Sequence, residues 1–254
     1  MTDPFSAAQF TDAINYLSLK AAPEEDDEKP WRFNRMVSFL RKPLIIAMEN
    51  GIETIFWGIR HLVQSIIYLS DQLHSGRFRS PEGAAVRGIL GGLANERGQR
   101  LVADVLNKLD LSGLIMDKEV TIKPGGKLEN PKDIGDVDIM LIDPASKVLY
   151  SLECKAMSPS RNIREMSGEL NKLFGFPPKK GWVQKHMDRH EWLEKHLAEV
   201  GAVYHQDLEG FTVRSFFVTG EQLFAPHSLS QDLQLPFVTL YDFAKKGNRV
   251  LTAH

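Results

Sequence analysis

Hydrophobic positions follow two different periods along the chain, and the change between them predicts the elements. From Trp31 to Leu73 apolar residues recur at steps of three and four, which predicts amphipathic helices. Another helix is expected to start at Ser80-Pro81-Glu82, because Ser caps, Pro suits the first turn and Glu lies near the positive end of the helix dipole. Apolar runs bounded by turn residues predict strands at 119–123, 135–142, 148–155, 211–219 and 236–241, and helical spacing predicts helices at 161–173 and 182–200.

This order of elements predicts the fold class. Helix, three strands, helices and two more strands suit an α/β fold with a mixed central sheet flanked by helices, preceded by a helical N-terminal region. We expect an acidic, partly disordered segment at residues 1–30, a helical region at 31–78 and the sheet domain at 79–254. The acidic run at 22–28 is expected to be a solvated linker, or a segment that mimics nucleic acid or docks on a basic partner.

Two of the predicted strands form a hairpin that carries charged residues. The apolar runs at 135–142 and 148–155 flank Asp143-Pro144-Ala145-Ser146-Lys147, whose residue types favour a tight reversal. Because side chains alternate between the faces of a strand, Asp136 and Asp138 are expected to share one face with Met140. The apolar side chains expected on the opposite face are those of Val137, Ile139 and Leu141.

The second strand of the hairpin ends in an acid and a base. Glu153 and Lys155 share a face by the same alternation, with Cys154 opposite as a core thiol. Pairing of the two strands would bring Asp138 close to Glu153, and like charges at such a distance repel unless a cation lies between them. Carboxylates and an ammonium on one face can hold a divalent ion and activate a water beside it. The pattern therefore predicts a metal-dependent nuclease.

These residues resemble the signature of the PD-(D/E)xK nuclease superfamily, the restriction-endonuclease-like enzymes, which include Holliday-junction resolvases and many restriction and repair nucleases. The matching residues are Asp138, Glu153 and Lys155, and Asp136 is a second acidic candidate. Members often carry one more Glu on the preceding helix, where Glu96 fits. The resemblance covers roughly residues 80 to 245, with a compatible order of elements.

The resemblance implies a role for each matching residue. Mg²⁺, for which Mn²⁺ is able to substitute, would be held by Asp138 and Glu153, with Asp136 in place of Asp138 or beside it, because hard cations prefer carboxylate oxygens. Lys155 would orient or deprotonate the attacking water and stabilise charge on the phosphate. The resemblance also implies the backbone carbonyl of Cys154 as a further ligand and Glu96 as a further catalytic residue.

Basic residues after the hairpin are candidates for binding phosphate, which supplies most nonspecific affinity for nucleic acid. Lys185 and Arg189 lie four residues apart, on one face of a predicted helix. An ordinary solvated helix explains the same pattern, since acidic residues dilute it. The candidate residues are Arg161, Arg164, Lys179, Lys180, Lys185 and Arg189.

Composition narrows the class of protein without selecting a function. The chain has 254 residues, 43% hydrophobic and 25% charged, which is ordinary for a soluble globular protein. One cysteine excludes an intrachain disulfide and fits a reducing cytosol, so we expect a cytoplasmic protein without a membrane span. The net charge of −2 does not by itself predict binding to nucleic acid.

The functional expectation is a Mg²⁺-dependent nuclease that cuts DNA, as the cutting subunit of a restriction, repair or defence assembly. RNA is an alternative substrate, because the metal acts on the phosphodiester and not on the sugar. The N-terminal helices are expected to support a homodimer or a larger protein assembly. The competing interpretation is a non-catalytic module of nuclease fold that binds nucleic acid or a protein partner, since a fold alone does not fix a function.

Overall fold

The computed structural model describes residues 6–20, 38–78, 84–228 and 235–252. The acidic run at 22–28 and the predicted helix start at 80–82 lie outside these residues. The chain divides into two compact units, Met1–Leu90 and Gly91–His254. The division falls within the helix α3 (Ala84–Leu106), whereas the sequence placed a boundary between residues 78 and 79.

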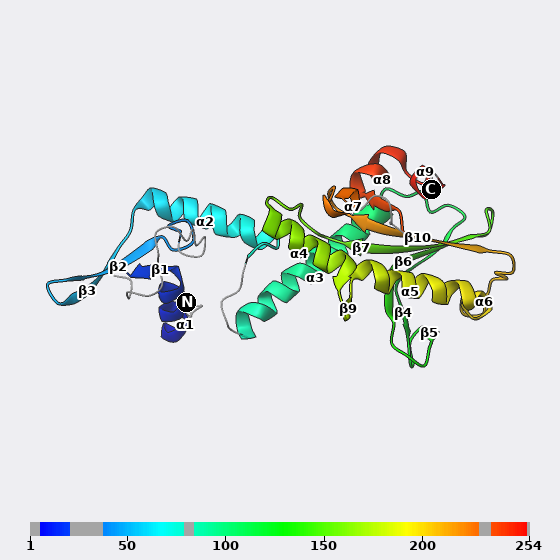
Figure 1. Cartoon of the computed structure of the whole chain (residues 1–254), viewed down its shortest axis with the longest axis horizontal. Helices are drawn as coiled ribbons and strands as arrows, with labels where there is room; N and C mark the ends of the chain where they lie inside the picture. Colours follow the sequence, from blue (N-terminus) through cyan, green and yellow to red (C-terminus); the bar gives the residue numbers. More distant parts are fainter. Residues whose placement is uncertain (1–5, 21–37, 79–83, 229–234, 253–254) are drawn as a thin grey trace, which may run out of the picture. The chain divides into compact units, whose positions relative to one another are not determined.

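The first unit contains a small sheet and two complete helices among its described residues (Figure 1). The sheet has the order β1-β2-β3, with β1 parallel to β2 and β2 antiparallel to β3. These elements are α1 (Ala7–Leu17), β1 (Ser18–Lys20), β2 (Leu44–Glu49), β3 (Ile52–Phe56) and α2 (Ile59–His74).

The β2–β3 hairpin corrects the prediction of an all-helical region. Asn50 and Gly51 form its two-residue loop, with φ of 53° and 79°, and Glu49 pairs with Ile52 on either side of it. A loop with positive φ at both central residues matches the twist of paired strands, and Asn-Gly is its strongest sequence signal. The helical prediction was therefore wrong for Leu44–Phe56, and it is confirmed for α2.

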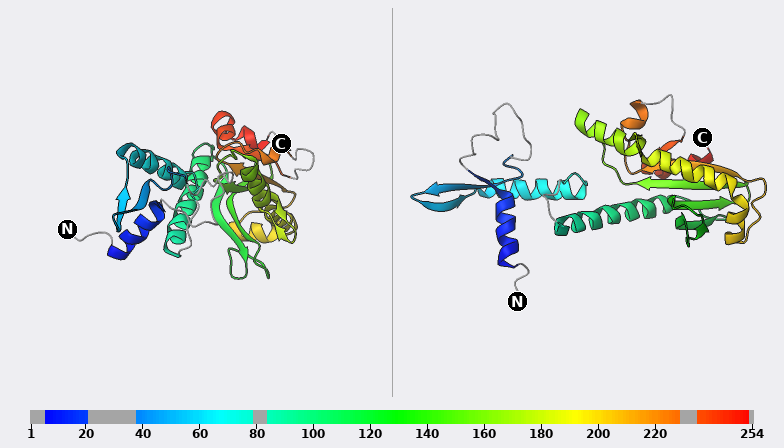
Figure 2. Two further views of the ribbon diagram at one scale, coloured as in Figure 1. Left: turned by 60° about the vertical axis from the view of Figure 1, so that its left-hand side comes forward. Right: turned by 60° about the horizontal axis from the view of Figure 1, so that its bottom comes forward.

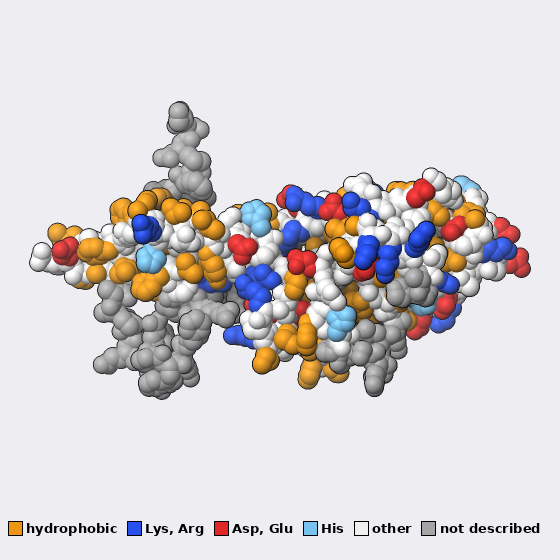
Figure 3. Space-filling view, turned by 90° about the horizontal axis from the view of Figure 1, so that it is seen from above, with side chains coloured by type: hydrophobic (Ala, Val, Ile, Leu, Met, Phe, Trp, Pro, Cys, Tyr) orange, Lys and Arg blue, Asp and Glu red, His pale blue; other side chains and the backbone are white. Residues whose placement is uncertain are grey.

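Helix α2 buries two polar side chains and exposes several apolar ones. Ser65 and Gln72 are each 1% exposed, and Ser65 Oγ donates a hydrogen bond to the carbonyl of Phe39. Hydrophobic side chains gather on the surface of this unit in Figure 3. The exposed apolar residues of α2 follow helical spacing and are Ile59, Val63, Ile66 and Ile67.

Within its described residues, the second unit is built on a six-stranded mixed sheet of order β11-β10-β7-β6-β4-β5. Strands β4, β6 and β7 form an antiparallel meander, while β10 is parallel to both β7 and β11. The mixed α/β architecture predicted from the sequence is confirmed. Its strands are β4 (Ile115–Lys123), β5 (Leu128–Glu129), β6 (Gly135–Asp143), β7 (Val148–Lys155), β10 (Thr212–Thr219) and β11 (Phe237–Thr239), beside a small hairpin of β8 (Gly175–Phe176) and β9 (Lys179–Lys180).

Helices cover both faces of this sheet, and Figure 2 shows α3 and α5 (Trp182–Lys195) on opposite sides of it. On one face, Leu101 and Val105 of α3 pack with Phe216 of β10. On the other, Trp192 and Leu193 of α5 pack with β4 and β6. The remaining helices are α4 (Ile163–Phe174), α5 (Trp182–Lys195), α6 (Leu197–Tyr204), α7 (Ala225–Ser228), α8 (Leu240–Lys246) and α9 (Arg249–Thr252).

Local chemistry explains where several elements end. The turn after β6 is held by Asp143, whose Oδ1 accepts hydrogen bonds from the backbone N–H groups of Ala145 and Ser146, as the sequence predicts. The strand predicted at 236–241 ends at Thr239, because Thr239 and Asp242 form a capping box that starts α8.

None of the helices in the described parts of the chain combines the length and hydrophobicity needed to cross a bilayer.

Candidate active site

The acidic cluster lies where the pairing of β6 with β7 ends. The last pair of the ladder is Ile139 with Leu152. The same register would next pair Asp138 with Glu153, but the two strands part at this point. The side chain of Asp138 spans the opening instead, and its Oδ2 accepts a hydrogen bond from the backbone N–H of Cys154 at 2.6 Å. A main-chain donor on β7 thus fixes one carboxylate of β6.

The alternation of side chains slips at Asp138. Val137 packs in the same core cluster as Met140, whereas Ile139 packs on the opposite face of the sheet. The predicted common face for Val137 and Ile139 is therefore wrong. The residue that the register places opposite Asp138 in β4 is Glu119, whose φ of 52° lies in the left-handed region, and the β4–β6 pairing omits this position. Asp138 thus departs from the regular sheet pattern and reaches across to β7.

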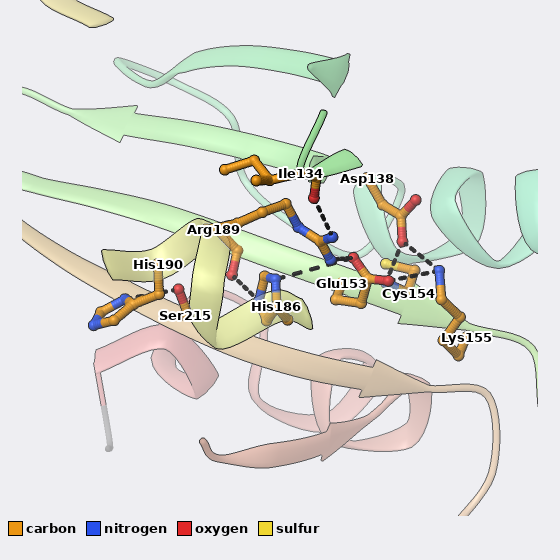
Figure 4. A network of polar contacts seen from close by, with 10 residues as sticks. Ile134, Asp138, Glu153, Cys154, Lys155, His186, Arg189, His190 and Ser215 are labelled. Atoms are coloured by element: carbon orange, nitrogen blue, oxygen red, sulfur yellow. Dashed lines mark hydrogen bonds and ion pairs between the residues drawn. The ribbon is translucent and has the colours of Figure 1, made fainter. Parts of the chain in front are cut away.

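Lys155 lies between the two carboxylates (Figure 4). Its Nζ is 2.7 Å from Glu153 Oε1 and 3.4 Å from Asp138 Oδ2. Burial alone would lower the pKa of Lys155, but the charges of Glu153 and then Asp138 outweigh it and raise the pKa above its ordinary value. The structure therefore brings Asp138, Glu153 and Lys155 together, with Lys155 as a charged ammonium at neutral pH.

Glu153 is the most enclosed member of the cluster. Its side chain is 7% exposed, and its Oε2 accepts a hydrogen bond from Arg189 Nη2 at 2.5 Å. Burial raises the pKa of Glu153; Lys155 and Arg189 oppose this shift, and Asp138 adds to it. His186 Nδ1 lies 3.9 Å from the same Oε2, and burial, followed by the charge of Arg189, lowers the pKa of His186 to about 3. His186 is therefore neutral beside this carboxylate.

Cys154 occupies the opposite face of β7, as the sequence predicts for a core thiol. It is 4% exposed and belongs to the core cluster beneath α3. Burial, and next the charge of Asp138, raise the pKa of this thiol well above its ordinary value. A thiol that stays protonated is a poor nucleophile, so its side chain serves packing.

An open cleft of about 890 Å³ leads to the cluster. Asp136, Asp138 and Lys155 line it, together with the basic side chains of Arg97 from α3 and Lys118 from β4. Glu153 does not line the cleft, since it lies deeper, towards α5. The cleft therefore presents acids and bases together, an arrangement that suits an anionic ligand accompanied by a cation.

Glu96 is not brought to this cluster. Its side chain is 64% exposed and pairs with Arg100 one turn along α3, at 3.4 Å. The neighbouring Asn95, Gly98 and Gln99 line the cleft, and Glu96 points off that face. Its predicted catalytic role gains no support from its placement.

The predicted basic residues do not form one surface. Arg189 is 5% exposed, so its predicted place on a phosphate-contacting face is wrong. The helix spacing that connects Arg189 with the buried Val183, His186 and Leu193 could have revealed this. The others lie at the surface: Arg161 pairs with Glu165, Lys180 pairs with Asp188, and Arg164, Lys179 and Lys185 are exposed.

The donors available to a metal are few but of the right kind. In the described part of the chain, no three His, Cys, Asp or Glu side chains converge as a metal site. Asp138 and Glu153 supply two carboxylates that already share one cation, the Lys155 ammonium. Mg²⁺ is commonly bound through one or two carboxylates, completed by waters and substrate phosphate. The pair is of the kind that Mg²⁺ takes from a protein, so a Mg²⁺ site here, with the carbonyl of Cys154 as a further ligand, stays a prediction.

Fold and site together define a mixed α/β protein with an acid-and-lysine cluster at the end of a cleft. The sequence profile described as Anti-phage protein Upx-like matches residues 20–213, so the chain belongs to the anti-phage protein Upx-like family. This membership indicates a role in defence, and the match includes Asp138, Glu153, Lys155 and Arg189.

No curated protein matches the sequence. Among solved structures, the crystal structure of protein VC1899 from Vibrio cholerae is similar to 77% of this chain with 13% sequence identity and a TM-score of 0.31. The similar region spans 43% of that protein.

Proposed function

We propose that this protein is a Mg²⁺-dependent nuclease that hydrolyses phosphodiester bonds of DNA in defence against phage. The observation that carries the proposal is the position of Lys155, with Nζ at 2.7 Å from Glu153 and 3.4 Å from Asp138 at the end of the cleft. Membership of an anti-phage family supports the defence setting. A restriction-endonuclease-like fold, as the sequence resemblance implies, agrees with an antiparallel meander followed by a parallel strand.

Asp138 and Glu153 would hold the metal, with Asp136 as a further acid on the cleft wall. A bound Mg²⁺ supplies polarisation of the phosphoryl oxygen and a lowered pKa for its water. Because its pKa is raised, Lys155 is a charged ammonium that donates hydrogen bonds. A charged ammonium can orient the attacking water and stabilise charge on the phosphate, but it is a poor base for deprotonating that water. Arg97 and Lys118 on the cleft walls would attract the phosphates.

The test is nicking of supercoiled plasmid with Mg²⁺ by wild type, Asp138→Asn and Lys155→Met. We expect a rate loss of about 100-fold or more in each variant, since Asp138→Asn removes the charge of a metal ligand and Lys155→Met removes the ammonium that stabilises charge on the phosphate. Lys195→Met, at an exposed position on α5, is the control and should cut like wild type. Retained cutting by both site variants would refute the site, and the same assay on RNA separates the two substrates.

One observation favours the non-catalytic alternative. Both oxygens of Glu153 already have partners, Arg189 and Lys155, which is how a purely structural ion network would look. Calorimetry with Mn²⁺ distinguishes the two functions. Binding that depends on Asp138 and Glu153 supports the nuclease, while DNA or protein binding without any bound metal supports the module.

Self-association through the N-terminal region stays a prediction. The first unit offers an apolar stripe for it on α2, where Ile59 is 73% and Ile66 is 63% exposed. Sedimentation of the full chain over a range of concentrations measures whether such an assembly forms.

A further inference from the structure

Arg189 connects the two acid-bearing strands from beneath. It lies on α5 with its side chain 5% exposed. Its Nη2 donates to Glu153 Oε2 on β7 at 2.5 Å, and its Nη1 donates to the carbonyl of Ile134, just before β6, at 3.2 Å (Figure 4). One guanidinium thus binds a carboxylate on β7 and the backbone directly before β6.

The contacts of Arg189 lie beyond the point where β6 and β7 are paired. Their ladder ends at Ile139 and Leu152, one pair short of Asp138 and Glu153. Beyond this pair, the separation of the two strands depends on side chains. The described links are the contacts of Asp138 with the backbone N–H of Cys154 and the ammonium of Lys155 on the cleft side, and those of Arg189 on the α5 side.

Gly135 gives independent support for a built contact. A Cβ at this position would lie 3.1 Å from Arg189 Nη1, and the backbone has φ of +94°, which side chains rarely adopt. Glycine at the first position of β6 therefore lets the guanidinium approach the strand closely. The planar fork of arginine suits two acceptors at once, which a single ammonium does not match.

We propose that Arg189 is a positioning residue that fixes Glu153 relative to Asp138, so that the two carboxylates hold a divalent cation at the cleft. Because Arg189 engages Oε2, it leaves Oε1 directed towards Lys155, 2.7 Å away. His186, neutral and fully buried on the same helix, packs beside this contact without competing for the charge. The inference rests on the proposed function.

The first test measures Mn²⁺ affinity by calorimetry in the absence of nucleic acid. Arg189→Met should bind about 10- to 100-fold more weakly than wild type, the usual effect of losing a group that orients a metal ligand. Arg189→Lys, which keeps the charge but offers one donor group, should fall between them. Lys195→Met on the same helix is the matched control and should bind like wild type.

The second test separates kcat from KM on DNA. Arg189 is buried and does not line the cleft, so Arg189→Met should lower kcat by a similar factor and leave KM for DNA unchanged. Gly135→Ala, which presses a methyl group against Nη1 with Arg189 still present, should weaken Mn²⁺ binding in the same direction. If Arg189→Met does not fold, as circular dichroism would show, Arg189→Lys and Gly135→Ala provide the same readouts.

The outcomes are distinguishable. Wild-type Mn²⁺ affinity in the folded Arg189 variants overturns the inference and leaves the nuclease intact. A rise in KM alone, growing with salt, also overturns it, because Arg189 would then contact phosphate. Wild-type protein that neither binds Mn²⁺ nor cuts DNA overturns the proposed function, and the role of Arg189 with it.

Discussion

At the scale of residues, the cluster around Glu153 is costly for the fold. Among the buried side-chain atoms of the described chain, His186 Nδ1, Arg189 Nε and Ser151 Oγ have no hydrogen-bond partner. Such groups usually find partners in native proteins, and an incomplete buried network is less stable than apolar packing. A fold that retains this arrangement beneath a cleft is consistent with a functional constraint on Glu153.

His186 makes the stability of the metal-free protein depend on pH. Its folded pKa is about 3, against 6.5 ordinarily, so between these values the unfolded chain binds a proton that the folded chain does not. Stability should therefore fall as pH drops from 6.5 towards 3, with a slope of at most about 1.4 kcal/mol per pH unit from this group. His186→Gln should remove this contribution, so its stability relative to wild type should improve as pH falls.

Urea unfolding at several pH values between 4 and 7, with EDTA present, measures this dependence. Lys195→Met serves as the control and should keep the wild-type profile. Parallel profiles for wild type and His186→Gln would show that the imidazole is not held neutral in the fold.

At the scale of elements, side chains tie β4 to its surroundings next to the site. Asp117 on β4 accepts a hydrogen bond from the hydroxyl of Tyr204 on α6 at 2.6 Å and pairs with Lys127. Burial would raise the pKa of Asp117, but the hydrogen bonds from Lys127 and Tyr204 outweigh it, and the pKa is lowered. The ammonium of Lys127 also lies 5.0 Å from the centre of the Tyr204 ring. These contacts hold the strand that contains Glu119 against α6.

Removing the Tyr204 hydroxyl tests this connection. Tyr204→Phe should lower the free energy of unfolding by about 1.5 kcal/mol at pH 7, because it deletes a hydrogen bond to an ionised carboxylate. A carboxyl group whose pKa is lowered in the folded state stabilises the fold at pH values above its unfolded pKa, and this stabilisation is lost as pH falls. The difference in unfolding free energy between wild type and Tyr204→Phe should therefore shrink below pH 3.8. Urea unfolding measures the stability at pH 7 and its dependence on pH. Tyr241→Phe, at a position that is 69% exposed, should leave both quantities unchanged. Equal stability of Tyr204→Phe and wild type at pH 7 would contradict the connection.

At the scale of the whole molecule, the net charge is only −2. Lys179 on β9 and Lys185 on α5 are exposed cations. Lys180 is engaged by Asp188 at 2.6 Å and should contribute less to binding. Nonspecific affinity for nucleic acid then depends on a few local positive charges and not on a positive net charge of the protein.

The salt dependence of DNA binding measures these charges. Each phosphate contact contributes about 0.9 to the slope of log affinity against log salt for duplex DNA, so Lys179→Gln with Lys185→Gln should reduce the slope by about 1.8. Fluorescence anisotropy with a labelled duplex in EDTA gives the slope. The control of equal charge is Lys108→Gln, at an exposed position after α3, combined with Lys195→Gln. A slope equal to that of wild type would place the DNA elsewhere.

Most strands and helices of the second unit could be predicted from the sequence. Period-two runs and turn residues located the strands, and Asp143 marked the hairpin turn, because these signals depend on neighbouring residues. The Asn50-Gly51 hairpin was equally local, but it was hidden by apolar residues whose spacing also suits a helix. Strand pairing predicted the approach of Asp138, Glu153 and Lys155, but the ladder ends one pair earlier, and the contacts of Asp138 with Cys154 and Lys155 complete it.

In the second unit, the sequence by itself determined the order of the main elements, the β6–β7 hairpin and the acids at its open end. The tertiary structure alone decided that Glu96 points off the cleft, that Arg189 is buried against Glu153, and that the alternation slips at Asp138. The physical reason is that periodicity defines a face only within one element. Which face is buried, and which charge meets which, depends on the elements that pack against it from distant parts of the chain.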